Sequence, residues 1–296
     1  MKAELDASGS ELPTPSLIPM SEALLLIDNP RPQVRRFTLN RPEKRNALSN
    51  SLRTELFSAL EAADRDESVR VSIIRGAGTC FSSGYQLGGG NDADQPYYTP
   101  DGIGQWPRHV VEGSFRIWDL AKPVIAQVHG YCLAGGSELA TACDLVYVAE
   151  DAQIGYPPVR SMSPPDMQFH PWLMGLRNAM EMMLTGDSIS GTEAVEKGFA
   201  NRAFPAEELG KRVLEMAERV AKVPSDIQQF NKRATHRAME IMGVRAAIRA
   251  GTEMQALAFF TPSSIAYREE FAKGVRHALS IRDGKFGDYR ESGKEC

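Results

Sequence analysis

The sequence predicts an α/β fold, with a mixed core of strands and helices over residues 21–204 and a helical region over residues 205–296. A strand, a glycine-containing turn, a helix and a second strand follow one another between residues 124 and 148, which indicates stacked β and α layers. A β-branched run at Val71–Ile74 indicates a further buried strand. After Pro205, four stretches have helical periodicity and none has the pattern of a strand.

Residues 1–20 precede the first predicted strand, and we expect them to form a flexible tail. They carry Glu4, Asp6, Glu11 and three prolines, where a signal peptide has a basic start and an apolar run and a transit peptide is rich in Arg. The chain's four cysteines include no CxxC pair and no His at zinc-ligand spacing. We therefore expect reduced thiols, no metal and a cytoplasmic location.

Two strands and a helix open the predicted core. The strands are expected at Ala23–Ile27 and Arg36–Leu39, joined through a proline-containing turn at Asn29–Pro32. Ser49 or Asn50 can cap the helix that follows. Its apolar residues recur at helical spacing and are Leu52, Leu56, Phe57, Leu60 and Ala63.

The middle of the core alternates regular elements with loops. The strand at Val71–Ile74 leads into a loop at residues 76–84. Residues 88–108 contain three consecutive glycines, prolines and aromatic rings, and we interpret this irregular stretch as a cover over a site. A strand at Val124–Val128, a helix from Gly135 to about Ala142 and a strand at Leu145–Val148 complete this part. The later helices are expected at residues 207–223, 226–242, 244–260 and 263–279.

Composition excludes several classes of protein. With 42% hydrophobic and 24% charged residues the chain is typical of a globular protein, and its net charge of -4 with scattered basic residues gives no reason to expect a nucleic-acid partner. No stretch approaches the roughly 18 uninterrupted apolar residues of a membrane span, so we expect no membrane partner. There is no complete dinucleotide fingerprint, no Walker-type motif and no Gly-x-Ser-x-Gly elbow.

Two glycine-containing turns carry the chemistry. Residues 81–87 and residues 130–140 each follow a strand, and glycine there lets the backbone approach a ligand closely. The second turn also opens a helix, whose free N–H groups favour negative charge. Such amides can stabilise an oxyanion. The alternative is that both are only tight turns between a strand and a helix.

The order and separation of these turns resemble the crotonase, or enoyl-CoA hydratase/isomerase, superfamily. The likeness includes residues 39–48, residues 126–154 and residues 184–187 with Ala194 and Gly198, and spans about residues 22–285. It implies a crotonase-like spiral of ββα units followed by a helical region that packs on a neighbouring subunit. It also implies a homotrimer or a dimer of trimers.

The resemblance assigns roles to particular positions. The two oxyanion-hole amides fall on Tyr85 and Gly135, and Glu138 matches one of two glutamates that hydratases use as acid and base. The alternative for Glu138 is a carboxylate that only offsets the helix dipole. The residues expected to bind the acyl-CoA are Lys44, Asn46, Ala47, Leu48, Ser83, Gly84, Gln86, Leu87 and Gly136.

The sequence departs from the family pattern at the second glutamate, where it has Pro158, and after the first oxyanion residue, where Gln86 replaces an Asp. Asp166 and His170 lie four residues apart, on one face if that stretch is helical. A His oriented by a carboxylate is a reasonable general acid or base. Our hypothesis is that this pair, with Glu138, replaces the missing glutamate. The alternative is that His170 only packs beside Trp172.

Three functions stay open at this point. The first is a hydratase or isomerase of fatty acid metabolism that forms a thioester enolate, with coenzyme A as part of the substrate and no separate cofactor. The second is a crotonase-fold hydrolase or an enzyme that cleaves a carbon–carbon bond, which Pro158 and the Asp166/His170 pair favour. The third is a member that binds acyl-CoA with little activity.

Overall fold

The computed structural model describes residues 23–87 and 95–287, and the predicted tail at residues 1–20 lies outside that range. A six-stranded sheet runs through the centre, in the order β1-β2-β3-β4-β6-β9. Only β1 is antiparallel to its neighbour. Its strands are β1 (Leu25–Arg31), β2 (Val34–Leu39), β3 (Val71–Gly76), β4 (Val124–Val128), β6 (Leu145–Ala149) and β9 (Arg202–Phe204).

A second, smaller sheet lies beside the first and has the order β5-β7-β8. Its strands are β5 (Tyr131–Leu133), β7 (Gln153–Gly155) and β8 (Ile189–Ser190). The core helices and 3₁₀ turns are η1 (Pro42–Lys44), α1 (Asn50–Arg65), α2 (Gln105–Trp118), α3 (Gly135–Thr141), η2 (Pro157–Arg160), α4 (His170–Thr185), α5 (Gly191–Glu196) and α6 (Ala206–Ala221). The predicted α/β fold class is confirmed.

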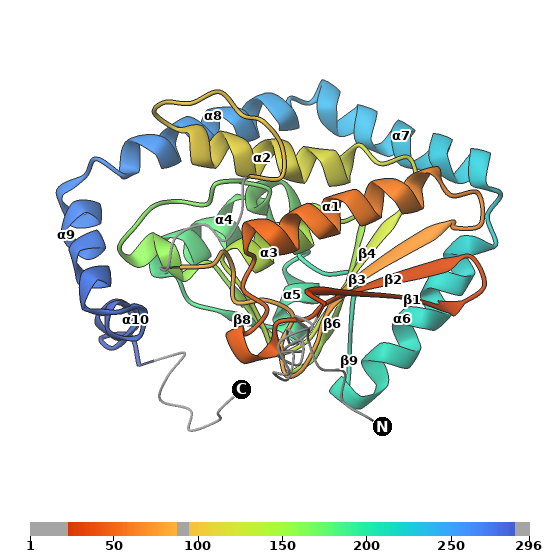
Figure 1. Ribbon diagram of the computed structural model, residues 1–296, viewed down its shortest axis with the longest axis horizontal. Helices are drawn as coiled ribbons and strands as arrows, with labels where there is room; N and C mark the ends of the chain where they lie inside the picture. Colours follow the sequence, from red (N-terminus) through yellow and green to blue (C-terminus); the bar gives the residue numbers. More distant parts are fainter. Residues whose placement is uncertain (1–22, 88–94, 288–296) are drawn as a thin grey trace, which may run out of the picture.

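The C-terminal region is helical, as predicted, and Figure 1 shows it running along the top and left of the molecule. Its elements are α7 (Ser225–Ile241), α8 (Val244–Ala258), α9 (Pro262–Glu270), η3 (Phe271–Lys273) and α10 (Val275–Asp283). Helix α8 packs along α2, and α10 contacts η2. None of the described helices combines the length and apolar character that crossing a membrane requires.

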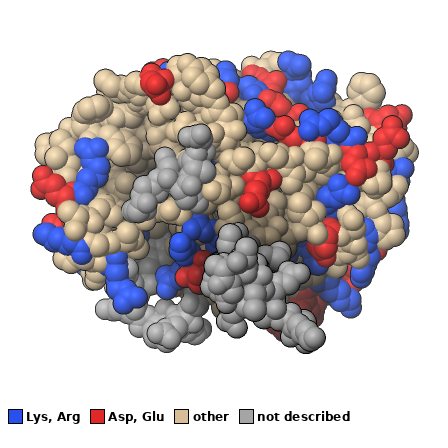
Figure 2. Space-filling view, viewed as in Figure 1, with Lys and Arg blue, Asp and Glu red and all other residues tan. Residues whose placement is uncertain are grey.

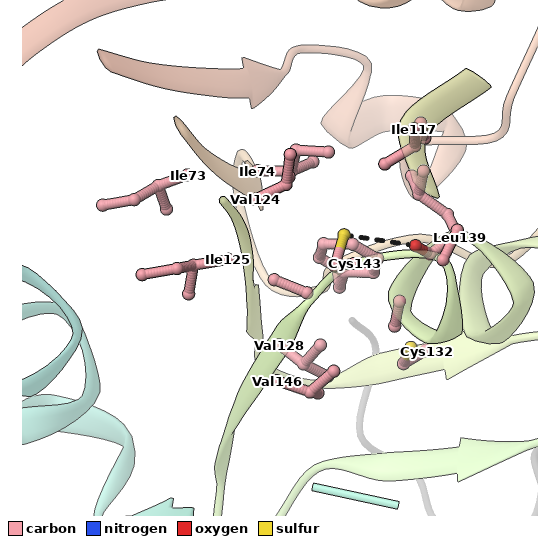
Figure 3. Close-up of a cluster of buried hydrophobic side chains, with 14 of the residues drawn as sticks. Ile73, Ile74, Ile117, Val124, Ile125, Val128, Cys132, Leu139, Cys143 and Val146 are labelled. Atoms are coloured by element: carbon pink, nitrogen blue, oxygen red, sulfur yellow. Dashed lines mark hydrogen bonds between the residues drawn. The ribbon is translucent and has the colours of Figure 1, made fainter. Parts of the chain in front are cut away.

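The hydrophobic core lies around β3 and β4, whose residues are almost all buried. Parallel strands that are covered on both faces read as continuous apolar runs, which is why Val71–Ile74 was predictable. Figure 3 shows Ile73 and Ile125 beside one another on adjacent strands, with Ile117 of α2 and Leu139 of α3 packing toward the sheet. This packing fixes α3, and with it the second glycine-containing turn.

Charged side chains on the face drawn in Figure 2 are mixed in sign, especially over α6 and α7 on its right-hand side. Ion pairs such as Arg212–Glu208, at 3.0 Å on α6, bring opposite charges together along a helix. Exposed pairs of this kind contribute little stability. They leave no patch of one sign on this face.

Two sequence predictions were wrong at element boundaries. The turn between β1 and β2 is not at Asn29–Pro32, because β1 continues to Arg31 and Gln33 takes the left-handed conformation with φ 63°. Pro30 is tolerated since β1 is an edge strand. The helix predicted at residues 263–279 is two helices, because Gly274, with φ 108°, interrupts it after η3.

The prediction that residues 88–108 are irregular was also wrong in part. Residues 88–94 lie outside the described residues, and residues 95–104 are irregular as expected. Helix α2, however, begins at Gln105, with Gly104 before it in the left-handed conformation. Pro107 lies in the first turn of α2, where the backbone N–H that proline lacks would have no acceptor within the helix.

Candidate active site

A cavity of about 540 Å³ opens between the α/β core and the C-terminal helices. The first glycine-containing turn lines it through Ser83 and Tyr85, and Asp166 lies on another wall. Gln255 of α8 and Leu279 of α10 also reach it. The C-terminal helices therefore complete the cavity within one chain, a role that the sequence did not reveal.

The first turn leaves one amide without a backbone partner. Leu48 N–H donates to the Gly84 carbonyl at 2.8 Å and Gln86 N–H donates to the Leu48 carbonyl at 3.1 Å, so Tyr85 lies between two bonds that hold the turn against residue 48. Among the described residues, the Tyr85 N–H has no backbone acceptor. Gly84 has φ 106°, a conformation that favours glycine.

The second turn presents the start of a helix. Ala134 N–H donates to the Gly155 carbonyl at 2.9 Å, and α3 then begins at Gly135. The Gly135 N–H, like every first-turn amide of a helix, has no acceptor within the helix. Ala134 itself has φ 50° and ψ -123°, which is strained for a residue with a side chain. Strain of this kind is often found at functional sites, and no sequence signal had marked Ala134.

The two turns touch at their glycines. A β-carbon built on Gly84 would lie 3.1 Å from the Gly135 nitrogen and 2.9 Å from the β-carbon of Ala134. A β-carbon built on Gly135 would lie 2.5 Å from a ring carbon of Tyr85. Only glycine at both positions permits this approach, which places the Gly135 nitrogen against Gly84, the residue before Tyr85.

Two buried carboxyl groups lie beneath these turns. Glu138 of α3 is 0% exposed and accepts hydrogen bonds from the Tyr85 hydroxyl at 3.0 Å and from the Met167 N–H at 3.2 Å. Asp166 is 3% exposed and accepts a long hydrogen bond, 3.5 Å, from the Tyr156 hydroxyl through Oδ2. Its Oδ1 is buried without a partner among the described residues.

Burial perturbs both carboxyls, and the charge of Asp166 adds to the effect on Glu138. Burial raises the pKa of Asp166 to about 7. Burial, reinforced by the charge of Asp166, raises the pKa of Glu138 well above its ordinary value. Two carboxyl groups so placed cannot both ionise near neutral pH. Glu138 is therefore the member that keeps its proton, and Asp166 is the member that can ionise near neutral pH.

The helical face predicted for Asp166 and His170 is wrong. Helix α4 begins at His170, so the two residues do not share a helical face, and residues 161–169 are irregular around Pro164 and Pro165. The His170 Nε2 lies 3.3 Å from the Ser137 hydroxyl, and its Nδ1 has no partner among the described residues. Burial lowers the pKa of His170 to about 4, so the ring is neutral.

The residues expected to bind the acyl-CoA divide into two groups. Lys44, Ala47, Ser83, Gln86 and Leu87 line the cavity. The others are not among the described residues that line it: Asn46, Leu48, Gly84 and Gly136.

Three residues hold the turns in place, and two of them, Asn46 and Gly136, are not among the described residues that line the cavity. The Asn46 amide donates to the Ala77 and Cys80 carbonyls, and Gly136 packs so closely on Ser82 that a β-carbon would lie 2.5 Å from its carbonyl oxygen. Gln86, in place of the family's Asp, accepts a hydrogen bond from Arg41 at 2.8 Å.

Comparison with known proteins identifies the family. The sequence matches the family described as enoyl-CoA hydratase/isomerase over residues 31–274. It is 31% identical to 2,3-dehydroadipyl-CoA hydratase of Escherichia coli, over 88% of this chain and 98% of that protein. It is 30% identical to the mitochondrial enoyl-CoA hydratase of Pongo abelii, over 84% and 82%. The chain belongs to the enoyl-CoA hydratase/isomerase family.

Solved structures support the same assignment. A crystal structure of an enoyl-CoA hydratase/isomerase from Xanthobacter autotrophicus superimposes with a TM-score of 0.80 at 32% identity, covering 89% of this chain and 98% of the other. An enoyl-CoA hydratase from Mycobacterium smegmatis gives 0.81 at 30% identity, covering 90% and 95%. The predicted crotonase-like fold is thereby confirmed.

This member of the enoyl-CoA hydratase/isomerase family has a buried cation that the sequence did not single out. Arg53 of α1 is 4% exposed, and its guanidinium lies 5.4 to 5.9 Å from the ring centres of Phe57, Tyr85 and Trp106. It donates to the Asn50 side chain at 3.3 Å. Stacking on aromatic faces stabilises a desolvated guanidinium, and its charge opposes the rise in the pKa of Asp166.

Proposed function

We propose that this protein acts on acyl-CoA thioesters as an enolate-forming hydratase or isomerase. The observation that carries the proposal is the contact between the turns at Gly84 and Gly135, beside the cavity that Tyr85 and Ala134 line. Two donors aimed at a thioester oxygen stabilise its developing negative charge, and losing one donor typically costs about 3 to 4 kcal/mol of barrier. Coenzyme A enters as part of the substrate, so the proposal requires no further cofactor.

Glu138 and Asp166 supply the proton chemistry in this proposal. One of them must be ionised to take a proton from the substrate, while the other, still protonated, can return one. Asp166 lines the cavity, and so does Pro158, which has no titratable group. Asp166 therefore provides the second carboxyl that the pattern of the family places at residue 158.

The cations at the cavity fit the coenzyme part of the substrate. Lys44 and Arg45 both line it, on the side of the first turn. Ammonium and guanidinium groups form charge-assisted hydrogen bonds with phosphate oxygens. We therefore place the phosphates of coenzyme A beside residues 44 and 45 and the acyl group beside Asp166.

A second candidate is a hydrolase or an enzyme that cleaves a carbon–carbon bond. Pro158 favours it, because Pro158 lines the cavity at the position where hydratases carry a second glutamate, and the usual addition of water uses both glutamates. The same pair of amides would stabilise the oxyanion of a tetrahedral intermediate. A member that only binds acyl-CoA is the remaining alternative.

A panel of CoA esters tests the proposal. Crotonyl-CoA reports hydration, a 3-enoyl-CoA reports isomerisation, and a cyclic β-ketoacyl-CoA reports carbon–carbon cleavage. We expect turnover of at least one enoyl-CoA without release of free coenzyme A thiol. Thiol release would support the hydrolase, and tight binding without turnover would support a binding protein. Neither binding nor turnover of any ester would contradict the proposal.

We also propose that the protein assembles as a homotrimer or a dimer of trimers. Large apolar side chains are exposed on the C-terminal helices, among them Phe230, Ile241, Met254 and Leu257. Apolar faces of helices are usually covered by another element. Light scattering coupled to size-exclusion chromatography should give three or six times the 32.6 kDa of one chain. A monomer at micromolar concentration would rule this assembly out.

A further inference from the structure

We propose that the Tyr85 hydroxyl is the group that exchanges a proton with the substrate, and that Glu138 acts through it. The inference rests on the proposed function, since it names the proton carrier of the same site. Resemblance to the family gives residue 85 a role only through its backbone amide. The side chain of this tyrosine adds a second role, which depends on where Glu138 lies.

Glu138 does not reach the cavity. It is 0% exposed, and it is absent from the described residues that line the cavity. Both of its carboxylate oxygens are occupied, Oε2 by the Tyr85 hydroxyl at 3.0 Å and Oε1 by the Met167 N–H at 3.2 Å. A proton moves only across hydrogen-bond distance, so a proton exchanged between Glu138 and a substrate must pass through a neighbour.

Tyr85 occupies the position between the carboxyl and the cavity. Its side chain lines the cavity, and its ring covers the start of α3, where a β-carbon on Gly135 would lie 2.5 Å from a ring carbon. The ring that carries the hydroxyl therefore lies against Gly135, whose amide is one of the two donors in the proposed function. The relay requires the carbon atom beside the thioester carbonyl to bind within hydrogen-bond reach of that hydroxyl.

The ring is held in this place by aromatic and cationic contacts. Trp106 packs edge-on against it, with 5.2 Å between ring centres, and the Arg53 guanidinium lies 5.8 Å from its centre. Arg53 also stacks near Trp106 at 5.4 Å. A ring fixed on two sides presents its hydroxyl in one direction, which is what transfer between two fixed partners requires.

The transfer balances in protons and electrons. When the enolate takes up a proton at its α-carbon, its electron pair forms the new C–H bond and the phenol O–H bond of Tyr85 breaks. The proton of the Glu138 carboxyl passes to the phenolic oxygen at the same time. The charge thus moves from the enolate to Glu138, and removal of an α-proton is the reverse of this step. Burial keeps the pKa of Tyr85 well above 10, so the two transfers are coupled and no phenolate accumulates.

The test is exchange of the α-protons of butyryl-CoA in D₂O, followed by NMR, with binding measured by calorimetry. Tyr85→Phe keeps the ring and the backbone amide and removes only the hydroxyl. We expect exchange to fall at least about 100-fold, the usual contribution of a general acid or base. Affinity should stay within about threefold, because one hydrogen bond has a small net contribution. Tyr98→Phe removes the same group from an exposed ring and should exchange as the wild type does.

The outcomes separate the inference from the function on which it rests. Exchange in Tyr85→Phe at the wild-type rate would overturn the relay and leave the function intact. Wild type that binds butyryl-CoA without exchange would also overturn the relay. Wild type that neither binds nor exchanges would overturn both. Retention of the wild-type melting temperature confirms that the variant is folded.

A second variant distinguishes a proton carrier from a hydroxyl that only positions Glu138. Tyr85→3-fluorotyrosine keeps the hydrogen bond to Glu138 and makes the phenol more acidic. A relay predicts that the exchange rate and its solvent isotope effect change with the fluorine, because the phenol's O–H bond breaks in the transition state. Rates and isotope effects equal to those of the wild type would assign the hydroxyl a positioning role and overturn the relay.

Discussion

Replacing Glu138 with Gln is expected to lower turnover by about 10²- to 10⁴-fold, the range that a general acid or base usually contributes. Gln has nearly the same shape, and its one amide oxygen can accept the hydrogen bond from the Met167 N–H while its NH2 group donates to the Tyr85 hydroxyl oxygen. It cannot ionise, so the carboxyl pair loses the group that stores the proton. Steady-state rates on the best substrate of the CoA-ester panel, together with binding of that ester, measure the effect. Turnover should fall while affinity changes little.

The matched control for this variant is Glu207→Gln. Glu207 is also a glutamate in the first turn of a helix, α6, but it is exposed. If Glu138 only offset the dipole of α3, the two variants would behave alike, with a stability change of about 0.3 to 1 kcal/mol each and no loss of rate. Equal activity in Glu138→Gln and Glu207→Gln would therefore contradict a catalytic role for Glu138.

Local patterns explain which features the sequence could predict. The run Val71–Ile74 reads as a strand because both of its faces are covered, and Ser49 caps α1 through the hydrogen bond from Leu52 N–H that such a residue normally accepts. The turns at Gly84 and Gly135 were found because glycine is required wherever backbones approach so closely. Each of these signals lies within a few residues of the feature it predicts.

Contacts between distant parts of the chain explain what the sequence missed. The hydroxyl of Tyr85 and the carboxyl of Glu138 are 53 residues apart, and no local period relates them. Asp166 was assigned to His170 because a spacing of four suggests a helix. The chain is not helical before His170, and tertiary packing brings Asp166 close enough for its charge to act on Glu138 instead.

A similar limit applies to Arg53. In the sequence it is one of many charged residues on an amphipathic helix, where a charge usually faces solvent. Only the packing of Phe57, Tyr85 and Trp106 around it reveals a buried cation. Its value to the site is electrostatic, since a positive charge there moderates the cost of holding Asp166 ionised.

Replacing Asp166 with Asn should stabilise the protein at pH 8 by up to about 4 kcal/mol, even as it impairs catalysis. The pKa of Asp166 is about 7 in the folded protein, against an ordinary value of 3.8. A carboxyl with a raised pKa binds more protons in the folded state than in the unfolded state between these values. The free energy of unfolding therefore falls as pH rises from about 4 to 7, by about 1.4 kcal/mol for each pH unit.

The direction in which stability changes with pH shows whether the folded protein favours Asp166 as a neutral carboxyl or as a carboxylate. Below pH 4 the wild-type carboxyl is neutral in both states, so Asn, which is also neutral and of similar shape, should leave the free energy of unfolding nearly unchanged. Above pH 7 the wild type holds a buried charge and the variant does not, so the difference is complete. Denaturant unfolding of both proteins between pH 4.5 and 8.5 measures it, with Asp151→Asn, at an exposed aspartate, as the control.

A variant that is less stable than the wild type at pH 8 would mean that Asp166 is stabilised as a carboxylate, for instance by Arg53, and would remove it from the proposed acid–base pair. The expected gain in stability at pH 8 would instead mean that the buried Asp166 carboxylate destabilises the folded protein. Asp166 has one buried oxygen without a partner among the described residues and an Arg53 charge that only partly offsets its burial. An aspartate at this position makes the protein less stable at neutral pH than an asparagine would. The acid–base role that we propose for Asp166 accounts for this loss of stability.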